Sequence, residues 1–552
     1  MTGSFDRDNY DAESARTLEG LAVKSLKDVR EASLDPRVTI TTRPMNELDE
    51  GFLDRIAHHG HHETKSTSSD KEKKEKEYSG TSDESEPIYI EFEPGDKRNP
   101  MNFPPTKKWT ITALACYFTL LSAATAGAYN MGFPTMTPEI GCTEYQATIG
   151  LSLYALGFGL VPLVTASFSE EFGRQALYVV SSLGFMLMYL MIAKAKNIQT
   201  ILVARFLQGG FGSTGSTMVG GTVADIWAPN HRGLPMALFA LTAIGGTGFG
   251  PVFAGWIEMN SHLGWRWIQW IQMINASVMF VLIPLVMKET RASIILTRLA
   301  KRLRKETGDK RYRARVEDER ASLKMLVYIS CTRPVYLMFT EPVVASFSLW
   351  IGFAWGVLYC MLESISSLFR NIHGFNIGQV GTVFCAMIIG SSLGFLTNFI
   401  QERYYQKGFA SRGPEARLYS ACIAAILFPG GMFIYAWTSF SHVSWVGLAM
   451  GVLVFTWSAY VIYLAVFSYL ADCYGPFASS ALAGQSLCRN IAGFTFPLFT
   501  NQMFKAMTYK WASTMFALIA TVMIPIPFIL FFHGPKIRSR SKFSSMVMES
   551  KK

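Results

Sequence analysis

Long apolar segments that are almost free of charge constrain this chain more than any other feature. Two examples are Trp109 to Tyr129 and Gly150 to Phe168, neither of which contains Asp, Glu, Lys, Arg or His. A helix of about 20 such residues spans the hydrocarbon core of a bilayer, whereas a helix of a soluble protein would keep a polar face. Charged residues make up 17% of the chain, against about 25% in typical soluble domains. The sequence therefore predicts an all-α, multi-pass membrane protein.

Twelve such segments can be placed along the chain, and a polar stretch at 288–335 separates them into six and six. The first six form a predicted N-terminal bundle at 106–287, and the others form a C-terminal bundle at 336–533. Two equivalent bundles are typical of carriers that rock about a site near the middle of the membrane. The predicted spans are 109–131, 146–168, 176–194, 198–223, 235–257, 267–287, 341–366, 377–400, 418–437, 444–470, 479–504 and 512–532.

The tails and the long loop are polar. Residues 1–105 bury too little apolar surface to fold alone, which predicts a disordered tail, and 534–552 form a second tail. Loops assigned to the inner side, with the C-terminal tail, hold 26 Lys and Arg, and the outer loops hold six when Lys194 at the end of the third span is included. The positive-inside rule then predicts that both ends and the loop at 288–335 are cytoplasmic. In that loop, Ile294 to Lys305 has the pattern of an amphipathic helix on the anionic inner leaflet, with a regulatory role as the alternative.

Several common classes of site are missing from the sequence. No Gly-x-x-x-x-Gly-Lys-Ser/Thr loop is present to bind ATP phosphates. The histidines of the hydrophobic part lie at span ends without a carboxylate at catalytic spacing, so no enzyme is predicted. The eight cysteines are scattered, and the cluster from His58 to His62 lies in the polar tail, which gives little support to a metal site. We expect no cofactor and no metal. We also expect no nucleic-acid partner, because the orientation of the chain in the membrane explains its net charge of +10.

Three ionisable residues lie away from the ends of the predicted spans: Arg205, Glu363 and Arg489. Because a charge inside a bilayer costs at least about 2.5 kcal/mol on insertion scales, such residues are candidates for substrate binding or proton coupling. Glu363 is the candidate for the proton or cation site, because a carboxyl group held partly away from water can exchange a proton. The alternatives are a hydrated Glu363 at the outer rim and an Arg205 that only ties helices together.

A short turn between the second and third spans contains Glu170, Gly173 and Arg174. It places a carboxylate at a helix end and an arginine directly after a glycine. Such a turn can hold a charged latch at the inner side of the membrane.

The fifth span contains several small residues and a proline, at Gly246, Gly250, Pro251 and Gly255. Small residues let membrane helices approach closely, and proline removes a backbone hydrogen bond. We therefore expect this helix to pack tightly or to bend. Packing without a directional role is the alternative.

These motifs resemble those of the major facilitator superfamily, and more narrowly the fungal drug and polyamine proton antiporters. The resemblance runs from about Pro100 to Lys542 and implies a gating role for the turn at Gly173, although Gln175 replaces a customary base. It also implies proton transfer at Arg205 in Arg205-Phe-Leu-Gln208-Gly209, and an antiporter signature at Gly250-Pro251. Further matching stretches begin at Leu263, Lys288, Ala300, Glu341, Gly356, Gly413, Tyr469, Phe496 and Lys536.

Other polar and aromatic residues are assigned by their place in the predicted spans. Aromatic side chains can stack on flat or cationic compounds, although they more often pack or anchor at interfaces. The candidate substrate cavity comprises Tyr154, Gln208, Trp355, Tyr359 and Tyr460. Charged residues near cytoplasmic helix ends are expected to form ion pairs, namely Asp225, Arg232, Glu415, Arg417 and Asp472.

Together the residues and the resemblance predict a proton-coupled secondary transporter that exports small cationic or amphipathic compounds, polyamines or drugs, by antiport through alternating access. Proton-coupled uptake and a non-transporting nutrient sensor are the alternatives. The expected partners are the bilayer, protons and a small-molecule substrate, and the chain is expected to work as a monomer. The plasma membrane is the expected location, with the vacuolar membrane as the alternative.

Overall fold

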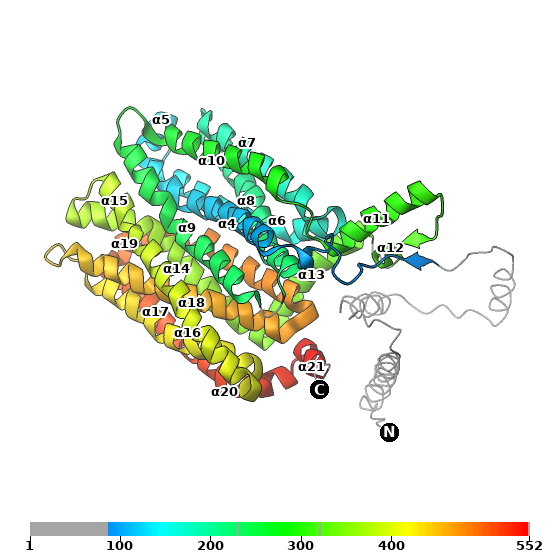
Figure 1. Cartoon of the computed structure of the whole chain (residues 1–552). Helices are drawn as coiled ribbons and strands as arrows, with labels where there is room; N and C mark the ends of the chain where they lie inside the picture. The colour runs from blue at the N-terminus through cyan, green and yellow to red at the C-terminus, as the bar shows by residue number, and fades with distance from the viewer. Residues whose placement is uncertain (1–86, 229–230, 319–321, 550–552) are drawn as a thin grey trace, which may run out of the picture. The chain divides into compact units, whose positions relative to one another are not determined.

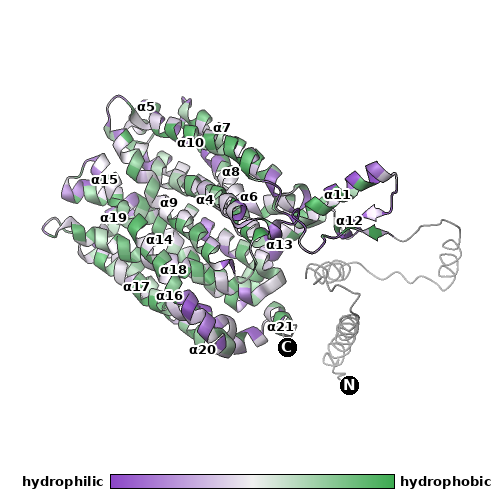
Figure 2. Cartoon of the chain, in the orientation of Figure 1, coloured by the Kyte–Doolittle hydropathy of each residue, from purple (hydrophilic) through white to green (hydrophobic). Residues whose placement is uncertain are grey.

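The computed structural model describes residues 87–228, 231–318 and 322–549. Almost all of these residues are helical, and the apolar residues lie along the long helices (Figure 2). In a bilayer, backbone N–H and C=O groups have no water to bind, so a spanning segment must satisfy them internally, as a helix does. The predicted tail at 1–105 lies mostly outside the described residues.

The N-terminal bundle contains the first six predicted spans (Figure 1, blue to green). α6 begins with a capping box in which Thr143 and Gln146 satisfy each other's backbone N–H groups. α4 packs against α9, and α6 packs against α8. The helices are α4 (Pro105–Ala128), α6 (Glu144–Phe172), α7 (Arg174–Ala193), α8 (Ile198–Ile226), α9 (Gly233–Met259) and α10 (Gly264–Val286), with the short η2 (Tyr129–Gly132) and α5 (Phe133–Ile140) after α4.

The C-terminal bundle contains the other six (Figure 1, yellow-green to red). α14 packs against α19, and α17 packs against α18. Two spans lie within α19, whose helical backbone is interrupted at Thr508. The helices are α14 (Pro342–His373), α15 (Ile377–Val383), α16 (Cys385–Arg412), α17 (Tyr419–Trp437), α18 (Trp445–Tyr474), α19 (Ala478–Met523) and α20 (Pro525–Ser539), with η4 (Gly413–Leu418) after α16 and η5 (Gly475–Phe477) after α18.

The described residues contain nine helical stretches that are long and apolar enough to cross a membrane. Two of them, Ile377–Trp437 and Ala478–Ser539, are 61 and 62 residues long, and each contains two predicted spans. α8 is not among the nine, because its glycines, its hydroxyl side chains and Arg205 lower its hydropathy. All twelve predicted spans therefore coincide with helices, which confirms the predicted all-α, multi-pass fold.

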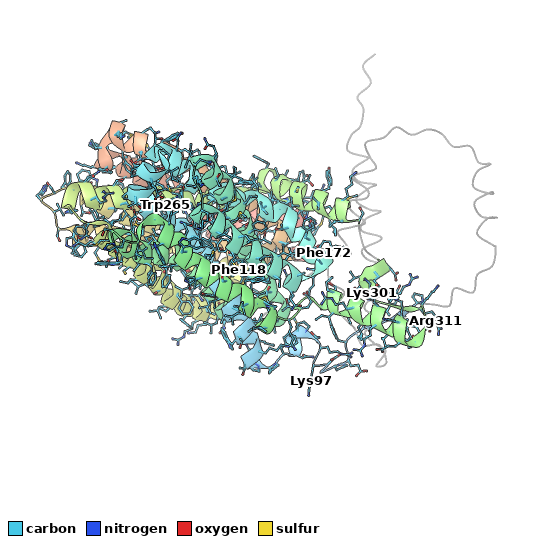
Figure 3. All side chains as sticks on the ribbon, turned by 90° about the horizontal axis from the view of Figure 1, so that it is seen from above. Lys97, Phe118, Phe172, Trp265, Lys301 and Arg311 are labelled. Carbon is cyan, nitrogen blue, oxygen red and sulfur yellow. The ribbon has the colours of Figure 1, made fainter. Side chains whose placement is uncertain are left out.

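The stretch predicted as a loop at 288–335 is largely helical. It contains α11 (Ala292–Thr307), β2 (Tyr312–Arg313), α12 (Arg315–Asp318) and most of α13 (Leu323–Thr340). β2 pairs in parallel with β1 (Ile88–Tyr89). Figure 3 shows Lys97, Lys301 and Arg311 beyond the ends of the long helices, whereas Phe118 and Trp265 lie among them. We call this side of the bundles the central-loop end.

α13 differs from the prediction, because it continues past the predicted bundle boundary at residue 335. It packs against both α6 and α19, and the Ser167 hydroxyl donates to that of Ser330 over 2.8 Å. α13 therefore connects the two bundles at the central-loop end. Residues 323–340 are largely apolar but include Lys324 and Arg333, and they lay partly in the predicted loop.

At the opposite end the bundles meet along α9, which packs against α15 and α16. The small residues of the fifth span make this approach possible. Gly246 and Gly250 face α4, while a Cβ atom at Gly255 would lie 2.6 Å from the carbonyl oxygen of Ile377 at the start of α15. The predicted tight packing of this motif is therefore present, and it includes a contact between bundles.

Replacing Gly255 with alanine is expected to lower the free energy of unfolding by about 1–3 kcal/mol, because the added Cβ forces α9 and α15 apart. Unfolding by sodium dodecyl sulfate in mixed micelles measures this change. The matched control is Gly430→Ala in α17, where an added Cβ meets nothing within 4 Å and alanine favours the helix by up to about 1 kcal/mol. Equal effects of the two substitutions would contradict this account of the α9 contact.

Candidate functional site

A cavity of about 1090 Å³ lies between the two bundles. Most of its lining comes from α4, α6, α8 and α9 on one side and from α14, α16, α18 and α19 on the other. Pockets that bury drug-sized ligands have volumes of about 300–1,000 Å³. The cavity is therefore large enough for a drug-sized molecule together with some water.

Charged side chains surround the cavity at the central-loop end. Arg417 contacts the carboxylates of Glu402 at 2.9 Å and Asp472 at 3.0 Å, and Arg291 lies 3.4 Å from Glu170. The cavity extends from these pairs toward Trp355 and Tyr359 of α14. These pairs place charges of both signs around the cavity at this end.

The predicted gating turn is held by residues from three segments. Gly173 has a φ of 91°, a conformation that glycine adopts without a Cβ clash. This geometry lets the backbone N–H of Arg174 donate to Glu289 Oε1 over 3.0 Å, and the Arg174 side chain forms an ion pair with Asp225 of α8. Arg174 is therefore fixed at both its backbone and its guanidinium.

Two other predicted ion-pair residues have different surroundings. Glu415 forms a buried ion pair with Arg538 of α20 at 2.8 Å. Arg232 donates to the backbone carbonyls of Trp227 and Ala224 over 2.7 and 2.6 Å. Within the described residues no carboxylate lies at ion-pair distance from Arg232, so its contacts are structural hydrogen bonds.

The inner part of the cavity is aromatic. Tyr154, Trp355 and Tyr359 of the predicted cavity set contribute to its lining. The guanidinium carbon of Arg489 lies 4.5 Å from the centre of the Trp355 ring and 5.3 Å from that of Tyr463. One end of the cavity thus combines flat apolar surfaces with a cation.

Gln208 and Tyr460, also predicted for the cavity, are not part of its lining. Gln208 is buried and accepts a hydrogen bond from Arg205 over 2.9 Å. The Tyr460 hydroxyl donates to the carbonyl oxygen of Ala237 over 2.8 Å. Because Tyr460 lies on α18 and Ala237 on α9, this hydrogen bond connects the bundles and leaves Tyr460 a structural role in this conformation.

Arg205 is fully buried behind Tyr154. Its guanidinium carbon lies 4.1 Å from the ring centre of Tyr129 and 4.5 Å from that of Tyr154, and Nε donates to the carbonyl oxygen of Gly150 over 3.3 Å. Nη2 has no hydrogen-bond partner. Among the described residues no carboxylate forms an ion pair with Arg205, so aromatic faces and neutral acceptors surround its charge.

Glu363 lies at the end opposite the central loop, where the bundles are in contact. Its side chain is 6% exposed, and Oε1 accepts hydrogen bonds from Thr148 of α6 over 3.1 Å and from Asn501 of α19 over 2.6 Å. Oε2 has no partner. The carboxyl group thus joins the two bundles and is buried, unlike the hydrated rim position that was the alternative.

A neighbouring contact completes this closed region. The Asn130 amide donates to the carbonyl oxygen of Leu362 over 2.5 Å, which joins the segment after α4 to α14. With the contacts of α9 and of Glu363, this defines what we call the distal seam: Asn130, Thr148, Gly255, Leu362, Glu363 and Asn501. The cavity approaches the central-loop end, and the distal seam closes the other end.

Several of these residues were not predicted from the sequence. Thr148, Asn501 and Asn130 are neutral, and a polar neutral residue inside a span carries little signal on its own. Glu289 was assigned to a stretch expected to be a loop. For metals, the described residues contain no cluster of three or more metal-ligating side chains, and the histidines from His58 to His62 lie outside those residues.

Comparisons with known proteins agree with this architecture. The family model described as Major Facilitator Superfamily matches residues 115–497. The crystal structure of the human organic anion transporter MFSD10 (TETRAN) has a TM-score of 0.54 and 16% sequence identity, and the match covers 77% of this chain and 100% of that chain. At this identity the likeness concerns the fold alone.

Fungal relatives match most of the chain. It is 34% identical to the MFS-type efflux pump MFS2 of Trichophyton rubrum, with 85% of this chain and 79% of that protein covered. It is 31% identical to the major facilitator superfamily multidrug transporter mdrA of Aspergillus fumigatus and 32% identical to the major facilitator superfamily multidrug transporter FLU1 of Candida albicans. Each of these two matches covers 85% of this chain and 78% of the relative.

Proposed function

The chain belongs to the Major Facilitator Superfamily, and on this premise we propose that it is a proton-coupled antiporter that exports small amphipathic organic compounds. The observation that carries the proposal is the combination of a cavity between two bundles at one end with a seam between the same bundles at the other. Alternating access requires this asymmetry in the states that are open to one side of the membrane. The names of the relatives, efflux pump and multidrug transporter, support export.

Glu363 is the proposed proton-exchanging group. Its carboxyl group contacts both bundles, through Thr148 on one and Asn501 on the other. Adding or removing a proton there changes what Oε1 and the unpartnered Oε2 can accept or donate. Protonation therefore changes the stability of the contacts in the distal seam. A proton-driven carrier has to control the opening and closing of such a seam.

Arg205 is the second proposed element of proton coupling. It is fully buried, and no carboxylate of the described residues pairs with it. A proton or an anion that binds near Tyr154 would therefore change the electrostatic energy of its guanidinium. Arg489, which lies in the cavity itself, is the third. The two arginines are on different bundles, so a change in their surroundings can accompany bundle movement.

The proposed orientation places the central-loop end in the cytoplasm, because basic residues concentrate there. The structure then corresponds to a cytoplasm-facing state that loads substrate from the cell interior. We further propose the plasma membrane as the location and a monomer as the working unit, and the vacuolar membrane remains the alternative. The polyamine specificity predicted from sequence rests on the resemblance alone.

Transport into inside-out membrane vesicles tests this function. The vesicles are given an acidic interior and supplied with labelled spermidine, rhodamine or naphthalene sulfonate. The proposal predicts accumulation of at least one compound, which a protonophore abolishes. Accumulation only in right-side-out vesicles with an acidic exterior would instead establish proton-coupled uptake, and no protein-dependent flux of any compound in either orientation would contradict a transport function.

A further inference from the structure

The charges that line the cavity are not balanced. Three carboxylates contribute to the lining, and each of them is paired with an arginine at the central-loop end. Five arginines contribute to it, namely Arg174, Arg232, Arg291, Arg417 and Arg489. Arg291 and Arg417 pair with the three carboxylates, and Arg174 pairs with Asp225 behind the lining. Within the described residues, the unpaired positive charge of the lining therefore belongs to Arg232 and Arg489.

Arg489 is the charged residue of the lining that lies deep in the cavity. It is 11 positions beyond Ala478, the first residue of α19, which corresponds to about 17 Å along the helix. Its Nη2 donates to the Ser486 hydroxyl over 3.3 Å, and its Nε has no hydrogen-bond partner in the described part of the chain. No carboxylate of the described residues forms an ion pair with this guanidinium.

The surroundings of Arg489 add further hydrogen-bond donors and another cation. Gln485 lies one helical turn away, lines the cavity and is 3% exposed. Its Nε2 has no hydrogen-bond partner among the described residues. Arg205 is buried behind Tyr154, which is itself part of the lining. A cavity with low-dielectric walls focuses the potential of such charges and favours ligands of the opposite sign.

The same region carries aromatic surfaces for the body of a ligand. The Trp355 ring is 4.5 Å from the Arg489 guanidinium, and Tyr359 and Tyr154 lie in the same lining. A ligand that places an anionic group on Arg489 and Gln485 would bring an attached ring system against these side chains. A guanidinium binds carboxylate or sulfonate through strong, charge-assisted hydrogen bonds.

We propose that the substrates of this carrier are organic anions with an aromatic body, and that Arg489 is the residue that selects them by charge. This inference rests on the proposed export function and names the substrate class for the same cavity. It argues against a polyamine substrate, because the described residues of the deep lining include no carboxylate to bind a polycation, and Arg489 places a positive charge there.

Three naphthalene compounds of matched size test the proposal: naphthalene sulfonate, its neutral sulfonamide, and the naphthyl trimethylammonium cation. Their equilibrium binding is measured with labelled compounds and the purified full-length protein in detergent micelles at neutral pH. The sulfonate is expected to bind at least about tenfold more tightly than the sulfonamide. One charge-assisted hydrogen bond in a site partly shielded from water provides a binding free energy large enough for this difference. The cation is expected to bind most weakly.

Arg489→Gln is expected to remove the preference for the sulfonate while leaving sulfonamide binding within about twofold, and Arg489→Lys should restore part of the preference. The matched control is Arg302→Gln on the exposed face of α11, which should bind all three compounds as the unaltered protein does. An equal loss of all three compounds in Arg489→Gln, with normal elution of the protein in size-exclusion chromatography, would overturn the charge-selecting role.

The tightest binding by the cation, or binding of none of the three compounds, would also overturn the inference. The export proposal is judged separately by vesicle transport. Proton-driven accumulation of spermidine or rhodamine without that of the sulfonate would leave export standing and reject the anion inference, whereas absence of any flux would reject export itself.

Discussion

Replacing Glu363 with glutamine is expected to reduce proton-driven accumulation in inside-out vesicles to the background of vesicles without the protein. Glutamine keeps the size of the side chain and can still accept from Thr148 and Asn501, the two hydrogen-bond partners of Glu363, so the fold should be retained. What it loses is the ability to bind and release a proton at the distal seam. Initial rates of uptake at several imposed pH gradients measure the effect.

Glu258 supplies the matched control for this substitution. It is a second buried carboxylate at the same end of the bundles, 5% exposed, and it accepts from the backbone N–H and the hydroxyl of Thr135 over 2.9 and 2.6 Å. Glu258 and Thr135 both lie in the N-terminal bundle, so the hydrogen bonds between them do not join the two bundles. Glu258→Gln should therefore retain pH-driven accumulation, and full accumulation by Glu363→Gln would remove Glu363 from the coupling step.

Replacing Glu415 with alanine is expected to lower the free energy of unfolding by about 3–5 kcal/mol, because it leaves the buried Arg538 without its counter-charge. In the native protein, Glu415 accepts from Arg538 Nε and Nη2 over 2.8 and 3.0 Å, and from the Tyr469 hydroxyl over 3.3 Å. The side chains of Glu415 and Arg538 are 2% and 8% exposed. Unfolding by sodium dodecyl sulfate in mixed micelles measures the loss.

The control for this prediction is an ion pair of similar length on the surface. Arg302 and Glu306 are 2.7 Å apart on α11, with side chains that are 75% and 53% exposed. Such an exposed pair contributes only about 0.3–0.5 kcal/mol, so Glu306→Ala should unfold almost as the unaltered protein does. An equal decrease in the free energy of unfolding for Glu415→Ala and Glu306→Ala would contradict the proposal that the buried pair stabilises the contact between α20 and η4.

The helices could be predicted from sequence because a spanning segment needs about 20 apolar residues and almost no charge. This rule found α8 despite Arg205, and it separated the two spans within α19. It did not indicate α13, which carries Lys324 and Arg333 and is not among the nine candidate spans of the described residues. A helix that lies at the ends of two bundles does not need an uncharged surface on every side.

The pairing of side chains could be predicted only in part. Charges near helix ends were expected to pair, and Arg417 does so with Asp472. The partner of Glu415, however, is Arg538, 123 positions away. Hydropathy does not fix the rotation of a helix that is apolar on most sides, so the neighbours of Glu363 and the bond of Tyr460 to α9 could not be inferred from the spans.

The most direct test of proton antiport follows the protons themselves. A pH-sensitive dye is enclosed in inside-out vesicles with an acidic interior, and rhodamine, spermidine or naphthalene sulfonate is added outside. The account predicts that a transported compound raises the internal pH in vesicles with the unaltered protein and fails to do so with Glu363→Gln. Accumulation of the compound with no change in internal pH, or with the same change in both proteins, would contradict proton exchange at Glu363.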